Sequence, residues 1–248
     1  MTESRIAVVT GAASGIGAAI ATRLAADGAA VALLARRAHR LEKLAAQIVE
    51  AGGRALAVPT DITDPAAVER AAATVQQQLG DVDLLVNSAG LMKLQPFGEV
   101  PVTEWQQMVD VNLKGLLEVT HAFLPALKRS AAERTTDLVN ISSLAADRYM
   151  AGMTTYGATK AAVTYWSRSI RAELAPDGIR VTNVEPGMTG GTELADDFPA
   201  DLRAMVDEMR ASLSAVQPEE LADVVAYIAS RPRHVNLSQI VVQPSKEV

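Results

Sequence analysis

The 248-residue sequence is informative first through what it lacks. It contains no cysteine, which excludes disulfides, thiol catalysis and cysteine-bound zinc or iron–sulfur centres. This absence also fits a reducing compartment. Acidic residues outnumber basic ones, 29 to 23, so a net charge of −6 provides no electrostatic footprint for nucleic acid or an anionic membrane surface. No apolar run reaches the roughly 18 residues of a membrane-spanning helix. We therefore expect neither a nucleic-acid nor a membrane partner.

Hydrophobic residues make up 49% of the chain, enough to bury one large core. The segments between the expected elements are short, and no repeat or low-complexity linker divides the sequence. We therefore expect a single domain over residues 1–248. The first five residues show no signal-peptide profile, and we expect a cytoplasmic location. The three histidines are scattered and predict no metal site: His39, His121 and His234.

Short apolar, β-branched segments alternate with amphipathic segments along the chain. The apolar segments predict strands at residues 6–9, 31–34, 55–58, 82–86, 138–141, 179–184 and 239–242. The others predict helices to about Asp27 and at 41–51, 64–79, 103–129, 155–176 and 218–230, with partial helix in 190–215. This alternation predicts the α/β class, as a three-layer doubly wound parallel sheet, or Rossmann fold, of about seven strands. Ligands bind such sheets at the carboxyl ends of the strands.

A glycine-rich turn connects the first strand to the first helix. Its sequence is Thr10-Gly11-Ala12-Ala13-Ser14-Gly15-Ile16-Gly17. Glycines in this context permit unusual dihedral angles, allow close backbone approach and direct helix N-terminal amides at an anion. The alternative is an ordinary tight turn. The flanking strand and helix favour nucleotide binding.

The residues that follow the second strand indicate which nucleotide is bound. An acidic side chain about 20 positions after the glycines would hold the ribose hydroxyls of NAD. Ala35 stands near that position, and Arg36 and Arg37 follow it. A guanidinium there could bind a 2′-phosphate through charge-assisted hydrogen bonds, with Arg36 as the first partner and Arg37 as the second. The alternative is a solvated basic pair. The sequence favours NADP(H).

Two further segments follow predicted strands and so belong to the same edge of the sheet. Asp61 and Ile62 follow the third strand. Asp61 could accept a hydrogen bond from the adenine amine, although capping the next turn suits it equally well. Residues 87–90, with the sequence Asn-Ser-Ala-Gly, follow the fourth strand.

Tyr156 and Lys160 open a predicted helix and lie one turn apart on the same face. A phenol normally titrates near ~10, and a neighbouring ammonium lowers its pKa towards the range that acid–base catalysis needs. Such a pair also occurs by chance on solvated helices. Two other polar residues accompany it: Ser143 ends a strand segment, and Asn112 lies within a long helix, where asparagine is a mediocre helix former.

In order and spacing, these motifs resemble the short-chain dehydrogenase/reductase family over essentially the whole chain. The motifs are Thr10-Gly11-x-x-x-Gly15-x-Gly17, Asn87-x-Ala89-Gly90, Asn112, Ser143, Tyr156-x-x-x-Lys160 and Pro186-Gly187. The arginine pair and the tail at 240–244 resemble the NADP-dependent branch that includes clavulanic acid dehydrogenase. The resemblance implies hydride transfer between NADPH and a carbonyl, or the reverse oxidation of a secondary alcohol. It also implies a homotetramer or homodimer.

The resemblance assigns roles to four catalytic residues. Tyr156 would protonate the developing alkoxide, and Ser143 would hydrogen-bond the same oxygen. Lys160 would lower the tyrosine pKa and bind the nicotinamide ribose, while Asn112 would hold a water that links Lys160 to solvent. The implied cofactor-binding set is Gly11, Ser14, Gly15, Ile16, Gly17, Arg36, Arg37, Asp61, Ile62, Asn87, Ala89, Gly90, Tyr156, Lys160, Pro186, Gly187 and Thr189.

The sequence departs from the family pattern in places. Ser88 stands where a second asparagine is common, and Ala146 where a glycine often follows the serine. The threonine after Pro186-Gly187 is displaced, which leaves Thr189 and Thr192 as alternatives for the nicotinamide contact. Since a fold does not determine a function, a redox-inactive nucleotide-sensing regulator, or a lyase or epimerase, remains an alternative.

Apolar residues near the predicted site indicate the character of its substrate. Residues 188–215 are rich in methionine and predict a mobile lid. Five apolar or aromatic residues follow strands on the active-site side: Met92, Leu144, Tyr149, Met150 and Met153. They predict a mostly apolar substrate pocket.

Overall fold

The computed structural model describes residues 4–94, 96–149 and 151–247. Its centre is a parallel sheet of seven strands in the order β3-β2-β1-β4-β5-β6-β7. The strands are β1 (Ile6–Thr10), β2 (Ala30–Ala35), β3 (Arg54–Pro59), β4 (Leu84–Asn87), β5 (Thr136–Ile141), β6 (Ile179–Pro186) and β7 (Gln239–Val242). Every neighbouring pair is parallel. The predicted doubly wound fold is confirmed.

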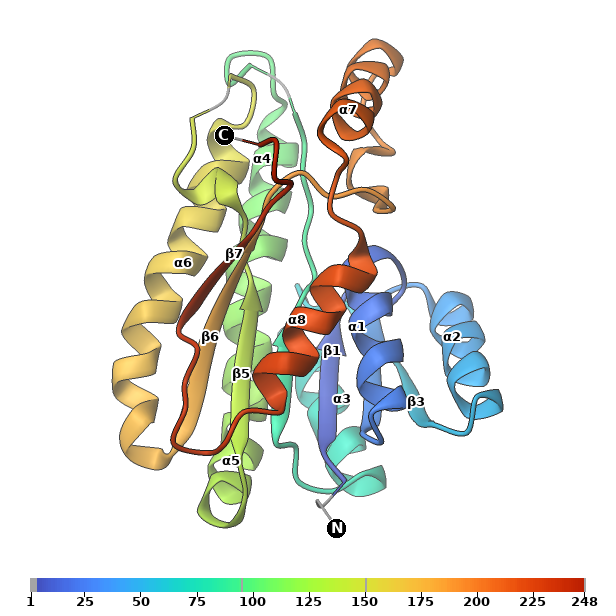
Figure 1. Ribbon diagram of the computed structural model, residues 1–248, viewed down its shortest axis with the longest axis vertical. Helices are drawn as coiled ribbons and strands as arrows, with labels where there is room; N and C mark the ends of the chain where they lie inside the picture. The colour runs from blue at the N-terminus through green and yellow to red at the C-terminus, as the bar shows by residue number, and fades with distance from the viewer. Residues whose placement is uncertain (1–3, 95, 150, 248) are drawn as a thin grey trace.

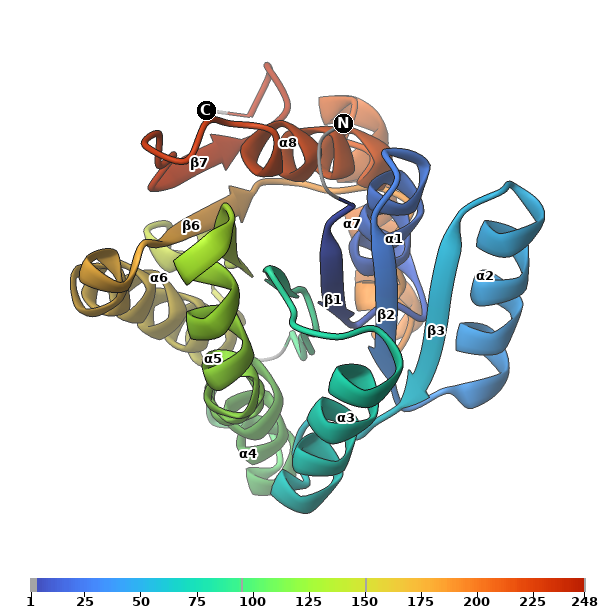
Figure 2. The ribbon, with the colours of Figure 1, turned by 90° about the horizontal axis from the view of Figure 1, so that it is seen from below.

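Helices cover both faces of the sheet, which gives the three layers seen in Figures 1 and 2. One face carries α1 (Gly15–Ala26), α2 (Ala38–Glu50) and α8 (Pro218–Ala229). The other carries α3 (Pro65–Gln78), α4 (Val102–Val109), α5 (Leu116–Glu133) and α6 (Thr154–Leu174). Two buried apolar clusters, one on each side of the sheet, form the core. The strands are buried on both faces and therefore read as continuous apolar runs in the sequence.

The long helix predicted at 103–129 is instead built from three pieces. Between α4 and α5 lies a π-helical turn, Asp110–Gly115, which contains Asn112. Helix α5 then continues past Pro125 to Glu133, so the predicted end at Arg129 was too early. π-Helical turns are rare and are frequent at functional sites. Here the turn places the asparagine side chain beneath the carboxyl ends of the central strands.

Helix α7 (Ala200–Leu213) stands apart from the layers, above the carboxyl ends of the strands in Figure 1. It belongs to the segment 188–215, which we call the lid. Thr189 and Val216, at the two ends of this segment, pair in a short parallel bridge. A small apolar cluster lies beneath α7 and contains Leu94, Phe198 and Val206. The two ends of the lid therefore lie side by side where they connect to the rest of the domain.

Candidate active site

Tyr156 lies in the first turn of α6, with its side chain only 6% exposed. The side chain of Ser143, which follows β5, lies close enough to act on this hydroxyl and lowers its pKa. The Ser143 hydroxyl also accepts a hydrogen bond from the Ala145 amide at 3.1 Å. This contact with the backbone holds the serine side chain in place. The structure therefore brings the predicted tyrosine and serine together.

Lys160 lies one turn along α6 from Tyr156 and is 5% exposed. Its Nζ donates to the carbonyl oxygen of Ile141, the last residue of β5, at 2.9 Å. The same Nζ is 5.8 Å from the centroid of the Tyr156 ring. Strand β5 and helix α6 thus position the ammonium together, and the predicted pairing on one helical face is confirmed.

Burial dominates the titration of both groups. It raises the pKa of Tyr156 to about 12, although the hydrogen bond to Ser143 acts in the opposite direction. Burial also lowers the pKa of Lys160 to about 8. The expectation that Lys160 lowers the tyrosine pKa is therefore not met in this structure. A low-dielectric site disfavours the charged form of each group.

Asn112 is 1% exposed and forms three hydrogen bonds from the π-helical turn. Its Nδ2 donates to the Leu91 carbonyl at 2.8 Å and to the Thr159 hydroxyl at 3.1 Å. Its Oδ1 accepts from the Leu91 amide at 2.7 Å. A Cβ added to Gly90 would lie 3.7 Å from Lys160 Nζ and 3.8 Å from Asn112 Oδ1. The side-chain oxygen of Asn112 and the Nζ of Lys160 thus both lie close to Gly90, a position that has no side chain.

The glycine turn has the geometry expected for close approach of a ligand or a second backbone. Gly11 and Gly15 have φ values of +69° and +51°, which L side chains rarely adopt. A Cβ at Gly17 would lie 2.5 Å from the Gly11 carbonyl oxygen, and one at Gly11 would lie 2.9 Å from the Ala89 Cα. The turn packs against the segment after β4. Ile16 is half-buried against the core.

Arg37, rather than Arg36, joins the glycine turn. Its guanidinium donates to the Ser14 hydroxyl at 2.9 Å and pairs with Glu193 of the lid at 2.7 Å. Arg40 pairs with the other oxygen of the same carboxylate. Arg36 is exposed, and its charge acts on Asp61. The residues that could hold a 2′-phosphate beside Ser14 are thus Arg37 and Arg40.

Several predicted cofactor residues act on neighbouring protein groups in the structure. Asp61 accepts hydrogen bonds from the amide and hydroxyl of Thr63 at 2.9 Å and 2.7 Å, which is the capping alternative. Burial raises the Asp61 pKa, but these bonds and the Arg36 charge together bring it below its usual range. Ile62 is buried in the core. The side-chain amide of Asn87, the last residue of β4, donates to the side-chain oxygens of Thr120 and Asn140.

Pro186 ends β6, and Gly187 follows it with an amide hydrogen bond to the Val242 carbonyl at 2.8 Å. The Thr189 hydroxyl donates to the Gly187 carbonyl at 3.0 Å. Thr192 instead lies against the glycine turn, because a Cβ at Gly15 would be 3.4 Å from its methyl carbon. Thr189 thus lies beside the Pro-Gly motif and Thr192 beside the glycine turn.

Comparison with known proteins decides the family. The sequence model described as short chain dehydrogenase matches residues 5–203. The chain belongs to the short-chain dehydrogenase family. A curated relative, a probable NADP-dependent dehydrogenase of Haemophilus influenzae, is 39% identical over 251 residues, covering 99% of this chain and 95% of the relative. The predicted oxidoreductase class is confirmed.

Solved structures of other members of the family agree with this fold. An alcohol dehydrogenase of the archaeon Thermococcus sibiricus, complexed with 5-hydroxy-NADP, has a TM-score of 0.88 at 29% identity over 99% of both chains. A serine dehydrogenase in a closed form with NADP+ has a TM-score of 0.85 at 32% identity, covering 98% of this chain and 96% of that one. The closer resemblance to the clavulanic acid dehydrogenase branch stays a prediction.

Two of the residues predicted to line an apolar pocket pack against residues of the lid. Met92 and Met153 pack against an apolar cluster that includes Phe198. Leu144 is buried, whereas Tyr149 is fully exposed, so the tyrosine does not contribute to an enclosed pocket. Met150 lies outside the described residues. Methionine side chains adapt to neighbours of different shape, which suits an apolar cluster under the lid.

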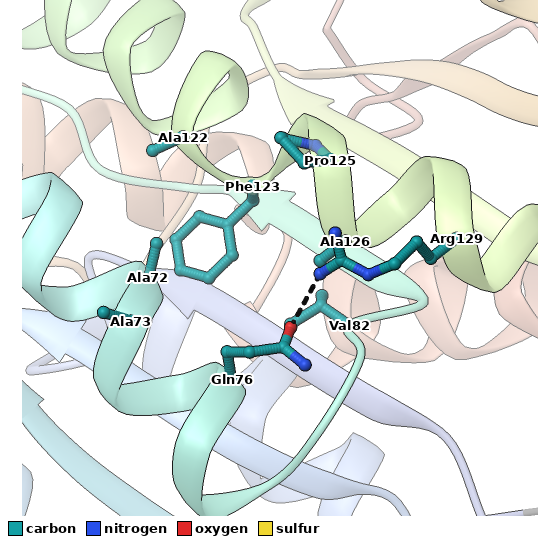
Figure 3. Close-up of a pocket in the computed structure, with 9 residues that line it drawn as sticks. All are labelled: Ala72, Ala73, Gln76, Val82, Ala122, Phe123, Pro125, Ala126 and Arg129. Carbon is teal, nitrogen blue, oxygen red and sulfur yellow. Dashed lines mark hydrogen bonds between the residues drawn. The ribbon is translucent and has the colours of Figure 1, made fainter.

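A separate cavity of about 190 Å³ lies between α3 and α5 of the dehydrogenase (Figure 3). Phe123 lines it, and a hydrogen bond of 3.0 Å from Arg129 to Gln76 crosses its edge. No predicted site residue lines this cavity. In the described part of the chain, no cluster of acidic or histidine side chains could hold a metal ion. Likewise, none of the helices in the described ranges is long and apolar enough to cross a membrane.

The sequence analysis did not identify two charged residues that lie next to Arg37 in this dehydrogenase. Arg40 lies three positions after Arg37 on one face of α2, a spacing that the sequence alone makes visible. Glu193 lies more than 150 positions away, and only the fold brings it to Arg37. Glu247 was also missed. Its carboxylate accepts from the Met188 amide at 2.9 Å and pairs with Arg148 at 3.3 Å.

Proposed function

We propose that this protein transfers a hydride between NADPH and a ketone or aldehyde, and in reverse oxidises a secondary alcohol. The observation that carries the proposal is the convergence of Tyr156, Ser143 and Lys160 at the carboxyl edge of the sheet. Donors that converge on one point suit an oxygen on which negative charge develops. Membership of the family gives the same reaction class.

NADP(H) is the cofactor. Relatives are named as NADP-dependent or were solved with NADP ligands. The chain's own residues fit such a ligand, because helix α1 begins directly after the glycine turn and its N-terminal amides suit a pyrophosphate. Arg37 and Arg40 supply two guanidinium groups next to the Ser14 hydroxyl, a donor set suited to a phosphate monoester. Ala35 places no carboxylate there that would repel it.

When bound, NADPH supplies the hydride, and the protein positions the carbonyl and provides the proton. With a pKa of about 12, the Tyr156 phenol is protonated at neutral pH and can donate to the carbonyl oxygen. Ser143 hydrogen-bonds the same oxygen and orients it. With a pKa of about 8, Lys160 is mostly charged at neutral pH and stabilises the phenolate that Tyr156 leaves behind.

Asn112 completes the proton path in this proposal. Its Oδ1 accepts one hydrogen bond from Leu91 and has a second lone pair available for a water molecule. Gly90 has no side chain between Oδ1 and Lys160 Nζ, so a water there could connect the lysine to solvent. The side-chain oxygen of Asn112 lies next to Gly90 because its residue is part of the π-helical turn.

The substrate in this proposal is a small carbonyl compound with an apolar body. Met92, Met153 and Phe198 form an apolar wall between the active-site loops and the lid, 188–215. Lid movement would admit the substrate and then exclude water. The experiment that tests the proposed function is a panel of ketones, aldehydes and secondary alcohols, read by NADPH absorbance with NADH as the control. Turnover of no panel member would contradict it.

We also propose a homodimer or homotetramer. Large apolar side chains remain exposed on the face of α4 and α6: Val102 is 59% exposed and Tyr165 is 74% exposed. Phe97, before α4, is 62% exposed. Exposed groups of this size indicate a surface that a second copy covers. Light scattering at low micromolar concentration tests this, and a monomer would contradict it.

A further inference from the structure

A carboxylate of the lid occupies the arginine cluster, which we define as Ser14, Arg37 and Arg40. One oxygen of Glu193 accepts from Arg37 at 2.7 Å, and the other pairs with Arg40. Arg37 donates at the same time to the Ser14 hydroxyl at 2.9 Å. An anion therefore already sits on the two guanidinium groups. This anion is the Glu193 carboxylate, a group of the protein itself.

The residue before Glu193 closes the glycine turn from the same side. A Cβ on Gly15 would lie 3.4 Å from the Thr192 methyl carbon and 3.5 Å from its Cα. In Figure 1 the orange segment between β6 and α7 lies above α1, on the side of the molecule that carries α2. Thr192 and Glu193 thus cover the two places where a dinucleotide's pyrophosphate and 2′-phosphate would be held.

The contact extends into the rest of the lid. Arg210 of α7 donates to the Thr189 carbonyl at 3.1 Å and to the Thr192 hydroxyl at 3.3 Å. Ala195 and Phe198, which follow Glu193, are buried in the apolar cluster under α7. A displacement of Glu193 would therefore move the neighbouring parts of the lid as well as its own side chain.

Charge favours a phosphate over this carboxylate. Two guanidinium groups and one carboxylate leave the arginine cluster with one net positive charge. A phosphate monoester carries ≈ −1.5 to −2 charges and three acceptor oxygens, enough for Arg37, Arg40 and Ser14 together. A second anion beside Glu193 would be repelled, so both cannot occupy the cluster at once.

We propose that Glu193 is a competing anion in the 2′-phosphate site, so that the cofactor's phosphate displaces it and thereby releases the lid from the glycine turn. This rests on the proposed NADP(H) dependence. NADH has no group that replaces Glu193 on the arginines. Glu193 therefore lowers the affinity for NADPH and makes lid release specific to the phosphorylated cofactor.

Binding of NADPH, NADH and 2′,5′-ADP to Glu193→Gln and wild type tests the competition. The substitution keeps the size of the side chain and removes its charge. Because the pair is partly exposed, we expect NADPH and 2′,5′-ADP to bind about two- to tenfold tighter, with NADH unchanged. The matched control is Glu208→Gln, an exposed glutamate of α7 in the same lid, which should behave as wild type. Weaker or unchanged NADPH binding in Glu193→Gln would overturn the proposal.

Hydrogen exchange of the amides at 190–199 tests the release of the lid without any turnover. We expect faster exchange in wild type when 2′,5′-ADP is added, and fast exchange in Glu193→Gln before addition. Equal exchange in all samples would overturn the link to the lid. Failure of the proposed function looks different, since wild type would then bind NADPH no tighter than NADH and 2′,5′-ADP no tighter than 5′-ADP.

Discussion

The Nζ of Lys160 lies 5.8 Å from the centroid of the Tyr156 ring and donates to a backbone carbonyl rather than to the phenol. In the proposed mechanism the lysine therefore stabilises the phenolate of Tyr156 through its electric field and not through a direct hydrogen bond. Because burial lowers the lysine pKa to about 8, this field weakens within the range in which enzymes are assayed.

The pH dependence of NADPH-linked reduction should reflect this lysine. Lys160 is charged below pH 8 and loses its charge as pH rises through about 8, whereas the phenol of Tyr156 keeps its proton to about 12. The value of kcat/KM for NADPH, measured at saturating carbonyl, reports groups of the free enzyme. We expect it to fall above about pH 8. A profile that stays flat to pH 10 would contradict the lysine assignment.

Asn112 should be needed for stability as well as for proton transfer. Asn112→Ala would leave both polar backbone groups of Leu91 without their side-chain partner. At about 1–3 kcal/mol for each of these two unsatisfied groups, we expect a loss of about 2–6 kcal/mol in the free energy of unfolding. Urea denaturation measures it. Lys114→Ala, in the same π-helical turn but with a side chain 65% exposed, is the control and should cost less than about 1 kcal/mol.

Cofactor preference should depend on Arg37 more than on Arg36. Arg37 is held beside Ser14, whereas Arg36 is exposed and its charge acts on Asp61. Loss of a charge-assisted contact costs about 1.5–3 kcal/mol, or roughly ten- to a hundredfold in NADPH affinity. We expect this loss in Arg37→Ala, a smaller one in Arg36→Ala, and little change for NADH in either.

The reciprocal change at the end of β2 tests the same site by repulsion. Ala35→Asp should turn the preference towards NADH, because it puts a carboxylate where the phosphate is held. Fluorescence titration with both cofactors measures the ratio of affinities. If Ala35→Asp still prefers NADPH, the phosphate lies elsewhere.

The sequence predicted the seven strands and most helices because the sheet is buried on both faces. Such strands read as unbroken apolar runs, and glycine or proline marks their ends. The π-helical turn around Asn112 was not predictable in this way. Its residues include weak helix formers, but these do not distinguish a π-helical turn from a helix end. In the structure Asn112 of this turn is held by contacts with Leu91 and Thr159, which are distant in sequence.

The candidate site was predictable where its residues are close in sequence or form motifs. Tyr156 and Lys160 share a helical face, and the glycine turn lies between a strand and a helix. The ion pairs of Glu193 were not predictable, because they depend on how the lid folds back over α2. The tyrosine pKa was expected to fall and instead rises, since burial depends on the whole fold.

The most direct test of the account is Tyr156→Phe, which removes only the hydroxyl of a buried ring. We expect NADPH binding and the free energy of unfolding to remain close to wild type, because the hydroxyl's described partner is Ser143. Carbonyl reduction with NADPH should fall by about 10²–10⁴-fold, the usual contribution of a general acid. Single-turnover NADPH oxidation with a carbonyl substrate measures this step. A Tyr156→Phe enzyme that binds NADPH normally and keeps most of its single-turnover rate would contradict the assignment of Tyr156 as the proton donor.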